Sequence, residues 1–344
     1  MRVIKKDSKK LVNYTTNNKR FIELNSESDV GEYCVNIGLL EKPKLISSIS
    51  NGYANNVWKI DSDKGVFFVK QILPHLKRNP DVKKQKGAFD REVLGNKTIA
   101  KILPGAVPYL VWADKHSQIC ITKSFANDKA VSMDTANPLG EEYSTAVERV
   151  VELIFQIQSK IKACQSDMLE LLQNNEFLCH QYSCLLLQLP FPTESFADRT
   201  NEVVNYLYQT PQTIVLFDVS PKNVLVYENQ VAFCDTETTC IGSAVFDVGY
   251  FLGNVLFDNL TKKSLQNGLD IVSTIIERAV SPRFSRKSIP STYLLDIIAA
   301  TLLYRKQGEV RYNKTVVECG DQNVVLSEAV HLAQQISERK IKLL

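Results

Sequence analysis

The first half of the chain alternates between short apolar runs and polar turns. Runs of four or five apolar residues, separated by turn signals such as Asn-Gly and Asp-Lys-Gly, favour short strands. We expect strands at 45–49, 57–60, 66–69, 109–112 and 118–122. One helix-like stretch at 87–102 interrupts them. Together these segments predict an antiparallel five-stranded sheet accompanied by one helix.

The second half has a mainly helical pattern. Apolar residues between Val147 and Ile157 recur at steps of three and four, which is typical of a helix with one buried face. We expect further helices at 195–208, 246–258, 264–280, 291–307 and 322–342, and short strands at 213–217, 224–227 and 231–234. The predicted fold class is therefore α+β, with a sheet-based first lobe and a larger, mainly helical second lobe.

Changes in the pattern of polar and apolar residues divide the chain into four segments. Residues 1–44 are polar with one helix-like patch at 30–40, and we expect an N-terminal extension there. Residues 45–123 form the predicted first lobe and residues 141–344 the second. The irregular polar stretch 124–140 between them predicts a hinge.

Composition and charge limit the classes of function. The 344 residues are 44% hydrophobic, enough for a large core, and the formal charge is only +3. No strong field is therefore available to recruit nucleic acid or a membrane surface, and we expect a small-molecule substrate. The N-terminus is too polar for a signal peptide. Eight cysteines without a C-x-x-C pair indicate free thiols, and these observations predict a cytoplasmic protein.

The strongest motif lies in the second half. Asp218-Val-Ser-Pro-Lys-Asn223 stands between two short apolar runs, and Asp235 follows a third run at 231–234. Phosphoryl transfer needs a carboxylate beside the attacking hydroxyl and oxygen ligands for Mg²⁺. In this interpretation Asp218 accepts the hydroxyl proton, while Asn223 and Asp235 bind magnesium. The alternative is an ordinary turn in which Asp and Asn bond only their own backbone.

A second motif in the first half supplies parts of a nucleotide clamp. A turn containing Gly52 and Asn55 can approach phosphates, Lys70 projects from the third expected strand, and Glu92 on the expected helix can hold that lysine. Each piece alone is also compatible with a simple hairpin or a solvated lysine. Their order along the chain, followed by the hinge and the acidic motif, favours a nucleotide-binding site.

At this point the chain resembles the small-molecule kinases of the aminoglycoside phosphotransferase and choline kinase superfamily, and most of all the 5-methylthioribose kinases. The resemblance rests on Lys70-Gln-Ile-Leu-Pro, on Asp235-Thr-Glu237, and on Tyr304-Arg305-Lys306, which is similar to a pair of substrate-binding arginines. It spans roughly residues 45–310. The resemblance implies a bilobal protein-kinase-like fold, ATP and Mg²⁺ as cofactors, and phosphorylation of a sugar hydroxyl.

The resemblance also implies roles for single residues. Ser124 and Phe125 would lie near the adenine, and Glu237 would join Asp235 on the metal. Arg305 and Lys306 would hold the sugar. Relatives of this kind often form dimers, and the sequence leaves a homodimer open.

Beneath the catalytic loop, the resemblance implies that Asp247 acts as a brace from the start of a helix. The loop itself departs from the superfamily pattern. Its usual His-Gly-Asp is replaced by Leu216-Phe217-Asp218, so its usual polar support is missing.

The acceptor residues depart from the pattern as well. Methylthioribose kinases tend to have Ser at the position of Asn223 and Arg at that of Lys306. A lysine lacks the planar, bidentate guanidinium of arginine, so the sequence specifies the acceptor less closely. The other interpretations are a kinase for an aminoglycoside or other antibiotic, for choline or for a nucleoside, and an inactive pseudokinase, which Leu216 favours.

Overall fold

We describe a computed structural model of the chain, which covers residues 21–49, 54–161, 172–210, 212–286, 289–312, 320–341 and 343, with side chains described except at 307–326. The strands are β1 (Pro43–Ser48), β2 (Asn56–Ser62), β3 (Gly65–Gln71), β4 (His75–Leu76), β5 (Asn79–Lys83), β6 (Leu110–Asp114), β7 (Ile119–Lys123), β8 (Val131–Ser132), β9 (Thr213–Val215), β10 (Val224–Tyr227), β11 (Gln230–Phe233) and β12 (Cys240–Gly242). The α-helices are α1 (Glu27–Asn36), α2 (Ala88–Ile102), α3 (Glu141–Ser159), α5 (Asn175–Tyr182), α6 (Glu194–Gln209), α7 (Ala244–Thr261), α8 (Leu265–Ile275), α9 (Ser281–Arg286), α10 (Ser291–Tyr312) and α11 (Gly320–Ser337). Shorter helical turns are η1 (Phe125–Asp128), η2 (Met133–Thr135), η4 (Ser183–Leu187), η5 (Pro221–Asn223) and η6 (Ile276–Val280).

The first lobe is built on an antiparallel five-stranded sheet in the order β1-β2-β3-β7-β6, as the apolar runs predict. Side chains alternate between the two faces along β3, and Phe67 and Val69 are buried on one face. Lys70 lies on the other face and pairs in register with Cys120 of β7. Cys120 belongs to a small apolar cluster with Phe89 of α2. The alternation therefore directs Lys70 toward the face that α2 covers.

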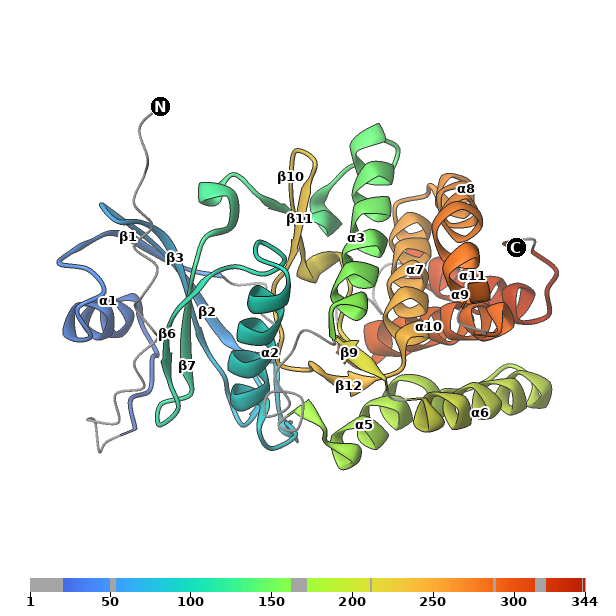
Figure 1. Cartoon of the computed structure of the whole chain (residues 1–344), viewed down its shortest axis with the longest axis horizontal. Coiled ribbons are helices and arrows are strands. Elements are labelled where there is room, and N and C mark those ends of the chain that lie inside the picture. The colour runs from blue at the N-terminus through green and yellow to red at the C-terminus, as the bar shows by residue number, and fades with distance from the viewer. Residues whose placement is uncertain are drawn as a thin grey trace.

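Helix α1 covers the opposite face of the sheet (Figure 1). Its first turn is fixed by a capping box, in which the Ser26 hydroxyl accepts from the Asp29 amide and the Asp29 carboxylate accepts from the Ser26 amide. Val30 and Cys34 are buried in one apolar cluster with the sheet. The described part of the expected extension, 1–44, thus contributes to the core of the first lobe.

Helices α3, α7 and α10 form the centre of the second lobe (Figure 1). Nearly every side chain of α7 is buried, as expected for a helix that is apolar all round. Two small sheets, β9–β12 and β8–β10–β11, lie where the second lobe meets α2 (Figure 1). They carry the acidic motif to this junction.

The predicted helices of the second lobe are confirmed, with two differences. The expected helix at 322–342 ends earlier, because α11 covers Gly320–Ser337. The expected helix at 264–280 is divided, because α8 ends at Ile275 and the wider turn η6 follows. The β4–β5 hairpin, β12 and α5 were not predicted. β4 and β12, of two and three residues, give too little periodic signal, β5 is polar, and α5 is only eight residues long. None of the helices in the described ranges has the length and apolar character needed to cross a membrane.

Helices α7 and α10 pack closely at two glycines of α7. A Cβ atom placed on Gly253 would lie 2.6 Å from the Thr301 Cβ and 2.9 Å from the Ile298 carbonyl oxygen. Gly249 meets Ile297 at similar distances. Because a backbone carbonyl cannot turn away as a side chain can, these glycines set the distance between the two helices.

We predict that Gly253→Ala lowers the free energy of unfolding by about 1–3 kcal/mol through overpacking, measured by urea denaturation. Gly31→Ala in α1 is the matched control, because its new Cβ would meet side chains and no backbone atom, the end of Ile46 at 3.1 Å and the Pro43 ring at 3.6 Å. The control should change stability by less than about 1 kcal/mol. Equal losses in the two variants would contradict this account of the α7–α10 contact.

Candidate active site

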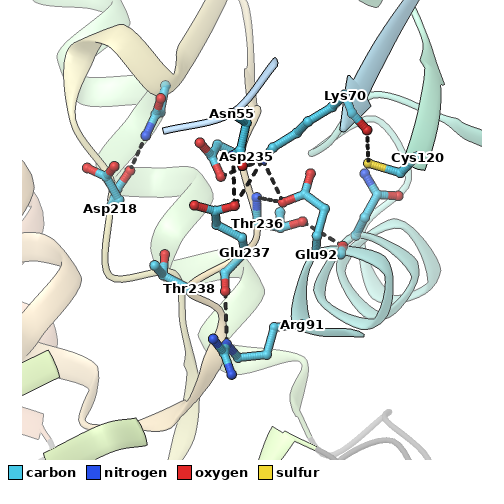
Figure 2. Close-up of polar contacts among 12 residues, drawn as sticks. Asn55, Lys70, Arg91, Glu92, Cys120, Asp218, Asp235, Thr236, Glu237 and Thr238 are labelled. Atoms are coloured by element: carbon cyan, nitrogen blue, oxygen red, sulfur yellow. Dashed lines mark hydrogen bonds and ion pairs between the residues drawn. The ribbon is translucent and has the colours of Figure 1, made fainter. Parts of the chain in front are cut away.

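Lys70 is the centre of a cluster of charges at the junction of the lobes (Figure 2). Its Nζ lies 3.1 Å from Glu92 Oε2, 2.8 Å from Asp235 Oδ1 and 3.7 Å from Glu237 Oε2. These partners come from α2 and from the loop after β11. One lysine therefore ties the sheet and its helix to the acidic motif of the second lobe.

The electrostatics of the cluster keep Lys70 charged. Burial alone would lower the pKa of Lys70, but Asp235, Glu92 and Glu237 together raise it well above its usual value. Burial opposes ionisation of Asp235 too, yet Lys70 holds the Asp235 pKa below its usual value. Burial raises the pKa of Glu92. The ammonium and the Asp235 carboxylate thus form a charged pair in a poorly solvated place.

Helix α2 also holds the loop that carries the acidic motif. The Thr236 amide donates to Glu92 Oε2 and the Thr236 hydroxyl to the Glu92 carbonyl, both at 2.8 Å. Arg91 Nε donates to the Glu237 carbonyl at 2.9 Å, and its guanidinium lies 3.7 Å from the centre of the Phe177 ring in α5. The position of the acidic motif is therefore fixed by backbone contacts as well as by charge (Figure 2).

Asp218 follows β9 at the start of a tight turn. Its Oδ1 accepts from the Ser220 hydroxyl at 3.0 Å, and Lys222 Nζ lies 3.4 Å from its Oδ2. Asn223 Nδ2 donates to the Asp218 carbonyl at 3.0 Å, and the Asn223 carbonyl accepts from the Cys234 amide. The Asn223 side-chain nitrogen thus bonds the backbone of its own turn, as the alternative interpretation of this motif predicts. The side-chain oxygen of Asn223 is the atom that can bind a cation.

Asp247 lies beneath this loop, in the first turn of α7. Its Oδ2 accepts from the Leu216 amide at 2.8 Å and its Oδ1 from the Phe217 amide at 3.0 Å. Thr238 donates its hydroxyl to the Leu216 carbonyl at 2.6 Å. The loop therefore has polar support through its backbone, although residue 216 is not histidine. Burial raises the pKa of Asp247 to about 7, against the effect of the two amide donors.

A cavity of about 780 Å³ lies between the lobes and collects most of the predicted site residues. Its lining includes Asn55, Lys70, Glu92, Ser124, Phe125, Asp218, Asn223, Asp235, Glu237 and Arg305. Lys306 is not part of this lining, and Gly52 lies outside the described residues. Donor-side and acceptor-side candidates thus share one space.

Sequence reasoning missed several residues that organise the site. Lys84, after β5, donates from Nζ to both Glu237 oxygens, at 2.9 and 3.0 Å, and to Asn55 Oδ1 at 2.6 Å. Arg91 and Thr236 hold the acidic loop from α2, as described above. Lys84 stands in a polar run of lysines that is typical of solvated loops, so its pattern gave no signal.

The donor atoms fit a magnesium ion that arrives with phosphates. Asp235 and Glu237 offer carboxylate oxygens, and Asn223 offers an amide oxygen. Among the described residues no group of three or more His, Cys, Asp or Glu side chains is arranged as a metal site. Mg²⁺ commonly uses one or two carboxylates and completes its shell with water and substrate phosphates. The residues therefore suit a nucleotide-bound ion better than a permanent structural metal.

Comparisons with known proteins identify the fold. No family model and no curated protein matches the sequence significantly. A choline/ethanolamine kinase family protein from Mesorhizobium loti aligns with a TM-score of 0.55 over 90% of this chain and 94% of that chain, at 14% identity. Aminoglycoside phosphotransferase APH(4)-Ia aligns with a TM-score of 0.55 over 91% of this chain and 99% of its own, at 13% identity.

A thermostable mutant of APH(4)-Ia in ternary complex with AMP-PNP and hygromycin B gives a TM-score of 0.54 at 12% identity, over 91% of this chain and 99% of that chain. At these identities the likeness shows the fold. The chain has the two-lobed α+β kinase-like fold of these small-molecule phosphotransferases, and the predicted fold class is confirmed.

We predict that Asp247→Asn destabilises the protein by about 2–3 kcal/mol, because an amide nitrogen would face one of the two loop amides. The loss should depend on pH. The wild-type carboxyl has a usual pKa of 3.8 and a folded pKa of about 7, so the wild type loses stability as pH rises through this window, by up to roughly 4 kcal/mol. The variant has no carboxyl at residue 247 and therefore no such loss. The difference in free energy of unfolding between the wild type and the variant should shrink as pH rises.

The check is urea denaturation of both proteins at about pH 5 and about pH 8. Asp270→Asn on the exposed face of α8 serves as the control and should track the wild type at both values. If the stability lost in Asp247→Asn, relative to the wild type, stays constant or grows with pH, Asp247 is ionised at both pH values.

Proposed function

We propose that this chain is a magnesium-dependent kinase that transfers the γ-phosphate of ATP to a hydroxyl of a small molecule. The observation that carries the proposal is the convergence of Lys70, Glu92 and Asp235 within 3.1 Å, on a cavity that Asp218 also lines. Phosphoryl transfer needs this combination of a phosphate-binding cation, metal-binding oxygens and a carboxylate for the attacking hydroxyl. A protein of the same fold forms a ternary complex with AMP-PNP and hygromycin B.

Each residue has a distinct task in this proposal. Lys70 binds phosphate oxygens of ATP, and Asp235, Glu237 and the Asn223 amide oxygen hold Mg²⁺, which neutralises charge on the phosphates. Asp218 orients the acceptor hydroxyl and takes its proton as the oxygen attacks the γ-phosphorus. The bond between the γ-phosphorus and the bridging oxygen breaks, and ADP leaves with that oxygen.

For the acceptor, we propose a ribose-like sugar such as 5-methylthioribose. The lining near Asp218 includes Lys222, Tyr304 and Arg305. Lys222 lies 3.4 Å from the Asp218 carboxylate and Arg305 lines the same cavity. These two cations favour a neutral or anionic polyol over a cationic acceptor, because like charges repel in a cleft of reduced dielectric. This charge pattern makes choline and polyamine-like aminoglycosides the weaker candidates.

The pseudokinase interpretation loses its main support. It rested on Leu216 in place of the histidine that usually steadies the catalytic loop. Asp247 and Thr238 hold the backbone of residues 216 and 217 instead. A loop that keeps its brace and its carboxylate has the parts that catalysis needs.

We predict that Asp218→Asn lowers kcat by roughly 10²–10⁴-fold, because an amide cannot accept the proton, and leaves MgATP affinity nearly unchanged. The measurement is ADP release coupled to NADH oxidation, with a panel of ribose derivatives, nucleosides, aminoglycosides and choline. Chelation of Mg²⁺ should abolish turnover as well.

Asp270→Asn is again the control for a surface Asp→Asn change and should retain full activity. A wild-type protein that binds MgATP but phosphorylates no member of a broad acceptor panel would support the pseudokinase instead. Turnover by Asp218→Asn at the wild-type rate would remove Asp218 from the mechanism.

A further inference from the structure

Lys84 is a second buried cation in the site, and the proposed mechanism does not use it. It follows β5, and its backbone amide donates to the Pro74 carbonyl at 2.9 Å, which closes the base of the β4–β5 hairpin. Its side chain is only 8% exposed. A lysine this well covered needs an anionic partner, because burial of an unpaired ammonium is costly.

The anionic partner of Lys84 is Glu237, a proposed metal ligand. Both carboxylate oxygens of Glu237 accept from Lys84, and Asn55 Nδ2 donates to Oε2 at 2.9 Å. Lys70 Nζ lies 3.7 Å from the same oxygen. Nitrogen donors therefore contact both carboxylate oxygens of Glu237.

A metal ion on Glu237 changes this balance. A cation on either oxygen competes with the Lys84 ammonium, which then loses part of the carboxylate with which it pairs. The anion that arrives together with the metal is the polyphosphate of the nucleotide. The hairpin is already at the cavity, since Leu76 and Arg78 belong to its lining. Lys84 is not itself part of that lining, but its ammonium contacts Asn55 and Glu237, which are, so it would meet phosphate oxygens where Glu237 turns to the metal.

We propose that Lys84 is a second phosphate-binding residue of the nucleotide site, held by Glu237 until a metal-bound nucleotide replaces that contact. The inference rests on the proposed function, since it requires that MgATP binds. It gives the β4–β5 hairpin a role as a wall of the donor site, in addition to Lys70 on β3.

The test is calorimetric binding of MgATP, MgADP and AMP to the wild type and to Lys84→Met. Loss of a charge-assisted contact to the outer phosphates should weaken MgATP roughly ten- to hundredfold and AMP by less than about threefold. Lys83→Met is the matched control, because Lys83 is the preceding residue of the same hairpin and is exposed. Lys84→Arg should restore part of the MgATP affinity.

Thermal unfolding of the unliganded variants separates this role from a structural one. Equal weakening of MgATP and AMP in Lys84→Met, or unchanged MgATP affinity, overturns the inference and leaves Lys84 as a tether of the hairpin. Should Lys84→Met not fold, Lys84→Gln, which can still donate to Glu237, is measured in its place with the same criteria. A wild type that binds no adenine nucleotide would instead overturn the proposed function, and this inference with it.

Discussion

The buried ion cluster around Lys70 is the interaction on which the arrangement of the lobes depends. Lys70 comes from the sheet, Glu92 from α2 and Asp235 from the second lobe. The Lys70 and Glu92 side chains are only 13% and 8% exposed, so each needs a charged partner. With Lys84 and Glu237 added, two cations face three carboxylates. The excess of negative charge suits a divalent cation, and the two lysines suit the phosphates that accompany it. One set of charges thus links folding of the cleft to recognition of its ligand.

The second constraint is the backbone at Phe217. Its φ of 63° lies in the left-handed region, which costs a non-glycine residue about 1–2 kcal/mol, and the superfamily pattern has glycine at this position. The strain is offset on both sides of the residue. The Asp247 carboxylate accepts from the Phe217 amide. The centre of the Phe217 ring lies 5.3 Å from that of Tyr182 and 4.8 Å from that of Phe246. An apolar side chain thereby anchors the loop that presents Asp218.

Sequence alone predicted the sheet, most helices and the meeting of Lys70 with Asp235, because strong periodicity and ordered motifs reflect local physics. It did not predict Lys84. In the sequence, Lys84 belongs to a run of lysines that is typical of a solvated loop. Only the path of the β4–β5 hairpin directs its side chain toward Glu237. Arg91 was equally invisible, since its contacts to the acidic loop and to Phe177 join segments far apart in the chain. Contacts of this kind depend on tertiary geometry, which no local pattern encodes.

The donor half of the site is more sharply specified than the acceptor half for a physical reason. Phosphate and magnesium demand fixed charges at fixed separations, and such charges leave motifs in the sequence. An acceptor is recognised by shape and by a few hydrogen bonds, which many residue combinations supply. Arg305 is an example. Its guanidinium lies 5.3 Å from the centre of the Phe257 ring, and this aromatic face orients the guanidinium plane. The contact does not determine which hydroxyls the guanidinium binds. Lys306, beside it on α10, lies outside the cavity lining. In the proposed function, a single planar fork would fix fewer hydroxyls of an acceptor than two forks, so this end of the site specifies its acceptor less sharply.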